Sequence, residues 1–525
     1  MDKIIKINSE LSDFLWGYPM IVALLFGGLV LVFRSNFWVF KNFSYIFKNT
    51  FGRLVKDSKS DENSISPFEA VSTALAGTIG AGNIVGVATA IGFGGPGAIF
   101  WMWIASFVCM TTKMVEVTMA VATRVSDDDG KYIGGPMYYI EKGAGSKFLA
   151  KVFSFFAFIA IIGTGALVQS NSISESLNAM TGLNIHIGGI LIVIFMLLVV
   201  VGGIKRIGSF ASKIVPIMSV FYIVGCLLIL ILQIESLLPA FKEIIVCAFS
   251  GKSIAGGATG SAILLSIRWG LARGIFSNEA GLGTAPMAHA TSHTDHPIRQ
   301  GMWGAIEVFI SSMIICTMTA LVIITSGLYE IKGLEGAALT AASFSKTLPL
   351  GKYIVSLALI LFAFTTAVSW CYYGQRCVKY LTGSTKISEI FKYAYIGFCY
   401  IGSIGGLKFA WSVADTANAL MVIPNIIALI IMSGTFRKIL KDFDKYKDSK
   451  KRGNYTWTYD NKWEKYFEKE KKTFANIFAK VFLIIYLSVQ ARNLDLFHEP
   501  CKLHQVFHIM MKDKLYSPFR LKGKY

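Results

Sequence analysis

The chain has 525 residues and a formal net charge of +19; 54% of its residues are hydrophobic and only 16% are charged. Soluble domains carry about 25% charged residues, so this composition disfavours a soluble globular protein and favours an integral membrane protein. The eight cysteines form no C-x-x-C pair, so we expect buried, reduced thiols rather than a disulfide framework or a metal site.

Apolar runs of about 20 residues, long enough to cross roughly 30 Å of hydrocarbon, recur along the chain. The first, Leu15–Phe33, is too long for the apolar region of a signal peptide and lacks a basic leader, so we interpret it as a retained helix. We predict an all-α membrane protein with about eleven transmembrane helices, near residues 14–34, 70–91, 97–123, 149–171, 187–203, 213–233, 261–289, 301–327, 352–375, 391–407 and 411–435.

Lys and Arg residues concentrate in alternate loops between these spans. Arg53 follows the first span and Lys142 follows the third, whereas the loops 92–96 and 172–186 contain no Lys or Arg. Cytoplasmic loops are the basic ones in membrane proteins. We therefore expect a multi-pass protein of the plasma (cytoplasmic) membrane, with its N-terminus outside and its C-terminus in the cytoplasm.

The sequence divides into a polytopic membrane domain, 1–436, and a basic cytoplasmic tail, 437–525. The tail has 21 basic and 10 acidic residues. A basic segment next to the last span is expected to lie against anionic headgroups of the lipid bilayer. Because its aromatic residues form no stacking module, no nucleic-acid partner is expected. No role is predicted for residues 476–525, and no oligomeric state.

Glycine-rich, polar stretches interrupt two predicted spans. The first is GTIGAGNIVG (77–86), and the second is ARGIFSNEAGLGTAP (272–286). They lie five spans apart, so with the extra helix 14–34 set aside they begin two five-helix repeats, 70–233 and 261–435. An odd number of helices in each repeat inverts the second in the membrane. Paired breaks at matching positions indicate a transporter binding site, although close helix packing explains glycine in either stretch alone.

A broken helix in hydrocarbon is tolerated only where the break lines a polar cavity. The freed N–H groups, at the positive end of a helix dipole, suit a carboxylate. The freed carbonyl groups suit Na⁺ or an ammonium group. Two breaks that face each other therefore fit an amino-acid zwitterion and a sodium ion.

Four stretches have the sequence of a known family. They are GTIGAGNIVGVATAIGFGGPGAIFWMW (77–103), GGPMYYI (134–140), ARGIFSNEAGLGTAPMAHA (272–290) and FAFTTAVSWCYYGQRCVKYL (362–381). Over about 60–435 the chain resembles the alanine or glycine:cation symporters of the amino-acid–polyamine–cation superfamily. The resemblance implies a leucine-transporter-type 5+5 inverted repeat with one extra N-terminal helix. It also implies a secondary active symporter, not an enzyme, that imports alanine or glycine with Na⁺ and has no other cofactor.

The resemblance implies a sodium site between the first broken helix and the eighth helix of the repeats. Its ligands would be the main-chain carbonyl groups of Ala76 and Ile79 and the hydroxyl groups of Thr365 and Thr366. Ordinary hydrogen bonding between helices is the alternative for the threonines. Asn83 follows the break, where we expect it to bind a second sodium ion or the substrate; capping of the second half-helix is the alternative.

Substrate contacts are expected on both breaks and on two further helices. Gln169 lies within the fourth span, where an unpaired amide is costly. The family resemblance implies that it contacts the substrate, and an interhelical bond is the alternative. The rings of Phe276 and Trp370, with Ser277, are expected to wall a pocket that selects small amino acids, although core packing is the alternative. The backbone N–H groups expected to bind the carboxylate are those of Thr78, Gly80, Ala81 and Gly82.

Four of the charged residues inside predicted spans are singled out here, because charges at membrane depth are functional by default. Arg273 and Glu279, near the second break, are expected to form either a gate or a structural ion pair. Lys113 and Glu116 are spaced for a pair on one helix surface.

Other function classes remain open at this point. A proton-coupled amino-acid permease of the same fold is the main alternative, and a membrane-embedded enzyme or a channel is a further one. An enzyme would need a catalytic cluster at the water interface. The nearest candidates share one helical face at the end of span seven, and we interpret them as solvated residues: His289, His293 and His296.

Overall fold

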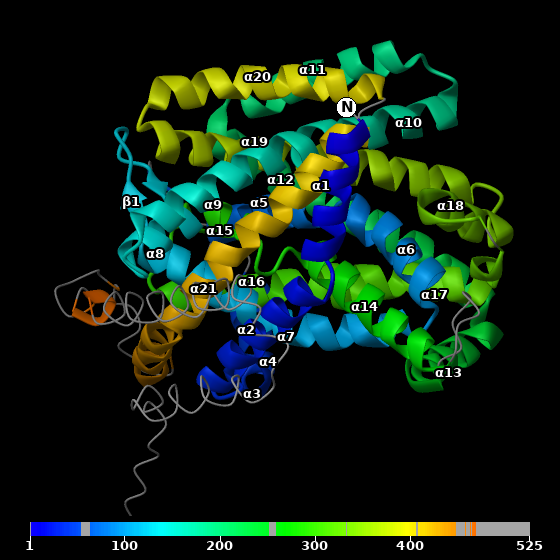
Figure 1. The fold of residues 1–525 in the computed structure, drawn as a ribbon, viewed down its shortest axis with the longest axis horizontal. Helices are drawn as coiled ribbons and strands as arrows, with labels where there is room; N and C mark the ends of the chain where they lie inside the picture. Colours follow the sequence, from blue (N-terminus) through cyan, green and yellow to red (C-terminus); the bar gives the residue numbers. More distant parts are fainter. Residues whose placement is uncertain are drawn as a thin grey trace, which may run out of the picture. The chain divides into compact units, whose positions relative to one another are not determined.

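The computed structural model describes residues 2–53, 63–250, 259–331, 333–405 and 408–447, together with 457, 463 and 465–468. These residues belong to one compact unit, Met1–Glu470. Within them the chain is helical apart from its connections and one two-stranded hairpin (Figure 1). Most of the tail predicted over 437–525, including 476–525, lies outside the described residues.

A group of N-terminal helices precedes the first broken helix. They are α1 (Asp2–Leu15), α2 (Tyr18–Arg34), α3 (Trp38–Lys41), α4 (Phe43–Thr50) and the 3₁₀ turn η1 (Phe51–Arg53). The α1 segment packs along α21 (Lys408–Tyr446), as Figure 1 shows. Asn8 donates to the Ser412 hydroxyl at 2.7 Å, and the Trp16 indole donates to the Asp415 carbonyl oxygen at 2.9 Å. The start of the chain is therefore anchored to the last helix.

The first predicted break is confirmed. The helix α5 (Pro67–Thr78) and the segment made of η2 (Ala81–Asn83) and α6 (Val85–Gly94) are bent by 63°. A capping box starts α5: the Ser66 hydroxyl accepts from the Glu69 N–H, and the Glu69 carboxylate accepts from the Ser66 N–H. The helix ends at Thr78, because Ile79, the next residue, takes an extended conformation.

The remaining elements alternate long helices with short connections. In the first half they are α7 (Ala98–Ala122), β1 (Val125–Ser126), β2 (Tyr132–Ile133), α8 (Pro136–Lys142), α9 (Lys147–Ala160), η3 (Ile161–Val168), α10 (Gln169–Thr181), α11 (Ile185–Val200), α12 (Gly203–Leu232) and α13 (Ile234–Ser250). In the second they are α14 (Thr259–Asn278), α15 (Pro286–His289), α16 (Pro297–Val308), η4 (Phe309–Cys316), α17 (Thr317–Ser326), η5 (Leu328–Glu330), α18 (Gly336–Thr347), α19 (Gly351–Thr382) and α20 (Thr385–Ile404). The segments η3 and η4 are π-helical and lie within otherwise continuous helices.

The second break begins later than the sequence suggested. The predicted interruption was 272–286, but α14 stays helical to Asn278, and the turn occupies 279–285. Gly281 and Gly283 have φ angles of 91° and 82°, in the left-handed region that only glycine adopts without strain. Glu279 adopts φ 53°, which is uncommon for a residue with a Cβ.

A short parallel bridge joins the segment before α5 to the segment after α15. Ile65 N–H donates to the Thr291 carbonyl at 3.1 Å, and His293 N–H donates to the Ile65 carbonyl at 2.7 Å. Arg124 reinforces this point by donating to the Ser292 carbonyl at 2.6 Å. The two broken helices are thus tied together at one end.

Helices long and apolar enough to span a membrane number six among the described residues, or seven with the bent pair α5–α6. Two shorter apolar helices, Pro19–Arg34 and Ile185–Val200, coincide with further predicted spans. The predicted spans 261–289 and 391–407 contain α14 and α20, which are not among the helices that meet this criterion. The chain is a multi-pass helical membrane protein, while the count of eleven and the two five-helix repeats stay predictions.

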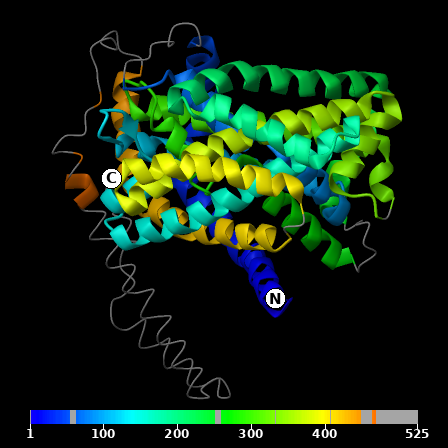
Figure 2. The ribbon, with the colours of Figure 1, turned by 90° about the horizontal axis from the view of Figure 1, so that it is seen from above.

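Two sets of four helices are each closely packed. In one, α10, α11, α19 and α20 contact one another, and α11 and α20 run side by side along one edge of the bundle (Figure 1). In the other, α6, α14 and α16 pack on α7, and α6 also packs on α14. Figure 2 shows several of the long helices running roughly parallel, whereas α21 crosses them obliquely in Figure 1. Seven cysteines fall within the described residues, and all seven are buried free thiols, as expected.

The hairpin β1–β2 lies in a loop predicted to be cytoplasmic. Its turn contains Gly130 with φ 77°. The Thr385 hydroxyl and the Lys379 ammonium group donate to the Asp128 carboxylate at 2.7 and 3.2 Å. These two hydrogen bonds, in that order of importance, lower the pKa of Asp128. They connect the hairpin to the junction of α19 and α20.

We expect Gly281→Ala to destabilise the fold, because a Cβ would be strained at φ 91° and would lie 2.5 Å from the Leu24 side chain. The midpoint of thermal unfolding in detergent should fall, by an amount that reflects roughly 1–3 kcal/mol. Gly397→Ala is the matched control: it lies within α20 and a Cβ there meets nothing within 4 Å. Equal midpoints for the two variants would contradict the prediction.

Candidate substrate and sodium site

A cavity of about 340 Å³ lies where the two broken helices meet. Its walls come from the first break, from the end of α14, from η3 and α10, and from α19 and α21. The first break lies close to the end of α14 there, because a Cβ on Gly82 would lie 3.5 Å from the Phe276 ring. A cavity of this size, with apolar walls and a few polar groups, is typical of a small-molecule site.

All but one of the predicted substrate-binding residues line this cavity. They are Thr78, Gly80, Ala81, Gly82, Gln169, Phe276, Ser277 and Trp370. Residues from four regions far apart in the sequence are therefore brought together: the first break, α10, α14 and α19. The exception is Asn83, which is fully buried away from the cavity.

Asn83 stabilises the first break. Its Oδ1 accepts the Gly80 N–H at 3.0 Å, and its Nδ2 donates to the Ser311 carbonyl at 3.1 Å. This is the geometry of the capping alternative. The Gly80 N–H is thus engaged within the protein, whereas Ala81 and Gly82 open η2, at positions that have no acceptor inside their helix.

The predicted sodium ligands are only partly assembled. The Thr366 hydroxyl lies within hydrogen-bond distance of the Ala76 carbonyl (3.1 Å) and of the Phe362 carbonyl in its own helix (2.9 Å). The Thr365 hydroxyl instead contacts the Phe362 carbonyl at 3.0 Å and the Met218 sulfur of α12 at 3.6 Å, away from the break. The Ile79 carbonyl makes no contact with either threonine among the bonds of the described residues.

Close approach of α19 to the first break requires glycine at position 80. A Cβ on Gly80 would lie 2.8 Å from the Thr366 oxygen. One turn further along α19, the Ser369 hydroxyl donates to the Thr73 carbonyl at 2.8 Å. Hydroxyl groups on one face of α19 therefore follow the carbonyl groups of α5.

Glu279 connects the second break to α19. The Trp370 indole N–H donates to Glu279 Oε1 at 3.2 Å, and the Thr284 hydroxyl donates to Oε2 at 2.5 Å. Glu279 is therefore bonded across the cavity wall, and it is not paired with Arg273. These two hydrogen bonds to the Glu279 carboxylate fix the orientation of the Trp370 side chain.

Arg273 and Asp415 lie at one end of the cavity. Both also line a second cavity of about 140 Å³, together with Trp16 and Phe276. The Trp16 and Phe276 rings meet edge to face, with centroids 6.2 Å apart. The aromatic pair therefore stands between the central cavity and the N-terminal helix.

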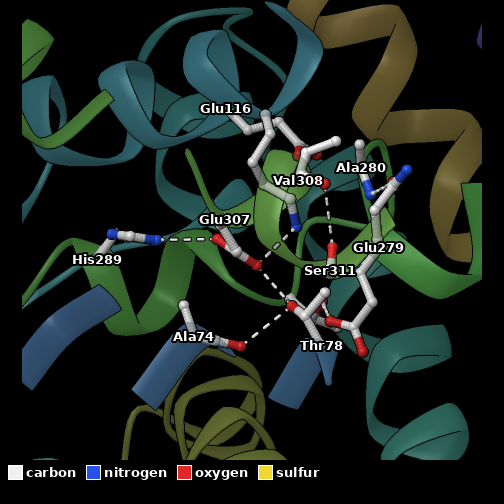
Figure 3. A network of polar contacts seen from close by, with 12 residues as sticks. Ala74, Thr78, Glu116, Glu279, Ala280, His289, Glu307, Val308 and Ser311 are labelled. Atoms are coloured by element: carbon white, nitrogen blue, oxygen red, sulfur yellow. Dashed lines mark hydrogen bonds and ion pairs between the residues drawn. The ribbon is translucent and has the colours of Figure 1, made fainter. Parts of the chain in front are cut away.

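Glu307 on α16 lies beside the first break, and the sequence analysis did not single it out. Its Oε1 accepts from the Thr78 hydroxyl at 2.5 Å and lies 3.4 Å from the Lys113 ammonium nitrogen. Its Oε2 lies 3.1 Å from His289 Nε2 (Figure 3). All four side chains are buried. Glu307 therefore joins α7, α16 and the segment after the second break to the end of α5.

Two expectations about charged residues were wrong. Lys113 pairs with Glu307 on a neighbouring helix, not with Glu116, whose carboxylate accepts from Asn425 Nδ2 at 2.6 Å. His289 and His296 are not solvated but buried, and of the three histidines His293 alone is exposed. The Gln300 amide lies 2.8 Å from His289 Nδ1. In both cases the partner residue lies on a different element, and the spacing of residues along one helix does not reveal such a partner.

Comparison with known proteins bears on this site. The model of the sodium:alanine symporter family matches residues 1–456. The sodium/alanine symporter AgcS of Methanococcus maripaludis is 42% identical over 451 residues, covering 85% of this chain and 98% of that protein. The probable sodium/glutamine symporter GlnT of Bacillus subtilis is 35% identical over 446 residues, covering 84% and 91%. Among solved structures, a manganese transporter of Eremococcus coleocola has a TM-score of 0.47 at 13% identity, covering 78% of this chain and 85% of that one.

We expect Glu307→Gln to lower the free energy of unfolding by roughly 3–5 kcal/mol, because it leaves the Lys113 ammonium group buried without a counter-charge. In the double variant Lys113→Met/Glu307→Gln, the loss should be smaller than the sum of the two single losses. Denaturant unfolding in detergent micelles measures both. Lys131→Met, which removes the exposed pair with Asp129, is the control and should change little. Additive losses at 113 and 307 would contradict this pairing.

Proposed function

The chain belongs to the sodium:alanine symporter family, and from this premise we propose that it imports alanine, or glycine, together with Na⁺ by alternating access. Membership makes it a sodium-coupled amino-acid symporter of the membrane and not an enzyme. The choice of alanine or glycine and the residues that bind it are the proposed part. Its relatives include a protein named for glutamine as well as one named for alanine.

The main support is the cavity at the junction of the two broken helices. Breaks in membrane helices expose backbone dipoles, and such breaks at a common cavity are typical of transporters that bind their substrate near the bilayer midplane. In the proposed mode, the substrate carboxylate accepts from the backbone N–H groups of Ala81 and Gly82. The side chain of the amino acid then lies against Phe276 and Trp370. Each excess methylene that these rings exclude is worth roughly 1–3 kcal/mol of selectivity.

The proposed sodium site lies next to Thr366. Its hydroxyl oxygen and the Ala76 carbonyl oxygen are 3.1 Å apart, so both can bind one cation after a small adjustment. The Ile79 carbonyl completes the set on the α5 side. Thr365 enters this site only if its side chain turns from the Met218 sulfur. Asn83 is predicted to bind a second sodium ion or the substrate, and it can do so only if its side chain turns from the Gly80 N–H.

Alternating access is proposed as a movement of the group α6, α7, α14 and α16 relative to the group α10, α11, α19 and α20. Each group is packed within itself, and the cavity lies between residues of both. The proposed orientation, with the N-terminus outside, puts Trp16 on the outer side of the cavity and the hairpin β1–β2 on the cytoplasmic side.

In proteoliposomes, an inward sodium gradient should drive radiolabelled alanine uptake above equilibrium, and alanine and sodium should each tighten the binding of the other. Binding titrations at several sodium concentrations measure this coupling. Uptake that follows a pH gradient and ignores sodium would instead favour a proton-coupled permease. Uptake that never exceeds the external concentration would favour a channel.

Thr366→Val should raise the sodium concentration for half-maximal alanine uptake by about tenfold, the cost of losing one bond to a charged group. Thr365→Val is the comparison of equal size on the adjacent position, and its effect should be smaller because its hydroxyl contacts Met218. The order of the two effects is the test. A larger effect at 365 would reject the proposed ligand assignment but leave symport intact.

A further inference from the structure

Two carboxamide side chains in the cavity wall share one anchor. Gln169 Nε2 donates to the Thr164 carbonyl at 3.2 Å, and Asn418 Nδ2 donates to the Thr164 hydroxyl at 2.7 Å. All three residues line the central cavity. Because a carbonyl only accepts, the first bond fixes which end of the Gln169 amide faces Thr164.

The carbonyl oxygens of both amides are left over. Gln169 Oε1 and Asn418 Oδ1 are buried, and neither has a hydrogen-bond partner within the part of the chain that the structure describes. Gln169 is 6% exposed and Asn418 is 1% exposed. A buried acceptor without a partner is costly, and native proteins keep few of them unless another molecule supplies the donor. Because Thr164 holds both amides, a single bound group with several N–H donors can satisfy both carbonyl oxygens.

The acceptor oxygens at this wall, and the helix dipole at the opposite one, favour a cationic donor here. Asp415 lies one turn before Asn418 on α21 and lines the same cavity, so the acceptors share their wall with a carboxylate. The first break is different in character, because the N-terminal end of α6 carries a positive dipole. Arg273, the one guanidinium among the described lining residues, belongs to α14 and lines the second cavity together with Asp415, so it offsets part of the charge of that carboxylate. The unpaired acceptors on one wall and the N–H groups of the first break on the other therefore give a zwitterion a preferred direction in the cavity.

We propose that the carbonyl oxygens of Gln169 and Asn418 form a binding subsite for the α-ammonium group of the substrate, with Thr164 holding both amides in place. This subsite rests on the proposed amino-acid symport and extends it. It adds Asn418 to the binding residues and gives Gln169 a chemical task. The carboxylate is then bound at Ala81 and Gly82, and the ammonium group at the opposite wall.

The test is calorimetric binding to the purified full chain at saturating sodium. The probes are L-alanine and propionate, which has the carboxylate and apolar carbons of alanine but no ammonium group. Asn418→Leu removes the acceptor at nearly constant volume, and Asn418→Asp keeps an acceptor oxygen. Thr416→Val is the matched control on α21, because within the described part of the chain the Thr416 hydroxyl bonds to its own helix, at the Ser412 carbonyl 3.1 Å away.

We expect Asn418→Leu to raise the alanine Kd by about tenfold or more, with propionate competition unchanged and Asn418→Asp close to the unmodified protein. Loss of alanine binding in Asp and Leu variants alike would overturn the subsite. So would equal weakening of propionate, or a similar loss in Thr416→Val, since each indicates a packing effect. A variant that needs more sodium but keeps the alanine Kd at saturation would also overturn it, in favour of a cation site. If the unmodified chain binds no alanine, the proposed function fails instead.

Discussion

A polypeptide that breaks a helix inside a membrane must find partners for every polar backbone group that the break releases. At the first break, the Asn83 carboxamide accepts the Gly80 N–H, and the Thr366 hydroxyl meets the Ala76 carbonyl. At the second, the Asn278 carboxamide accepts the Ala280 N–H at 2.9 Å. Side chains thus supply hydrogen-bond partners for some of the backbone groups at each break. The other backbone groups face the cavity. The binding site consists of the backbone polar groups that the protein's own side chains leave without a partner. This explains why polar residues gather there in an otherwise apolar chain.

The buried carboxylate of Glu307 holds the end of α5 in position from outside the cavity. Glu307 is bonded to Lys113, to His289 and to Thr78, the last residue before the first break. Burying an ion pair is costly, and removing one partner costs still more, so such pairs enforce one arrangement of the helices that carry them. The end of α5 is therefore positioned by contacts that lie outside the cavity.

Much of the fold could be predicted from the sequence, because apolar runs and glycine clusters report directly on spans and breaks. The residues around the cavity were found through the family resemblance and through their nearness to a break. Contacts between distant residues were not accessible in this way. The single glutamate in the span 301–327 was a usable signal for Glu307, but nothing in the spacing identified Lys113 as its partner. Adjacent helix residues point about 100° apart, so the sequence could not decide that Thr366 and not Thr365 faces the first break.

The parallel bridge between Ile65 and residues 291–293 has a mechanical consequence. Its two hydrogen bonds join the chain just before one broken helix to the chain just after the other. A movement that displaces either helix at this end must pull its counterpart along or rupture both bonds. The two broken helices are therefore coupled at this end. The flexibility needed to open a passage must come from the unwound residues nearer the middle of the bilayer.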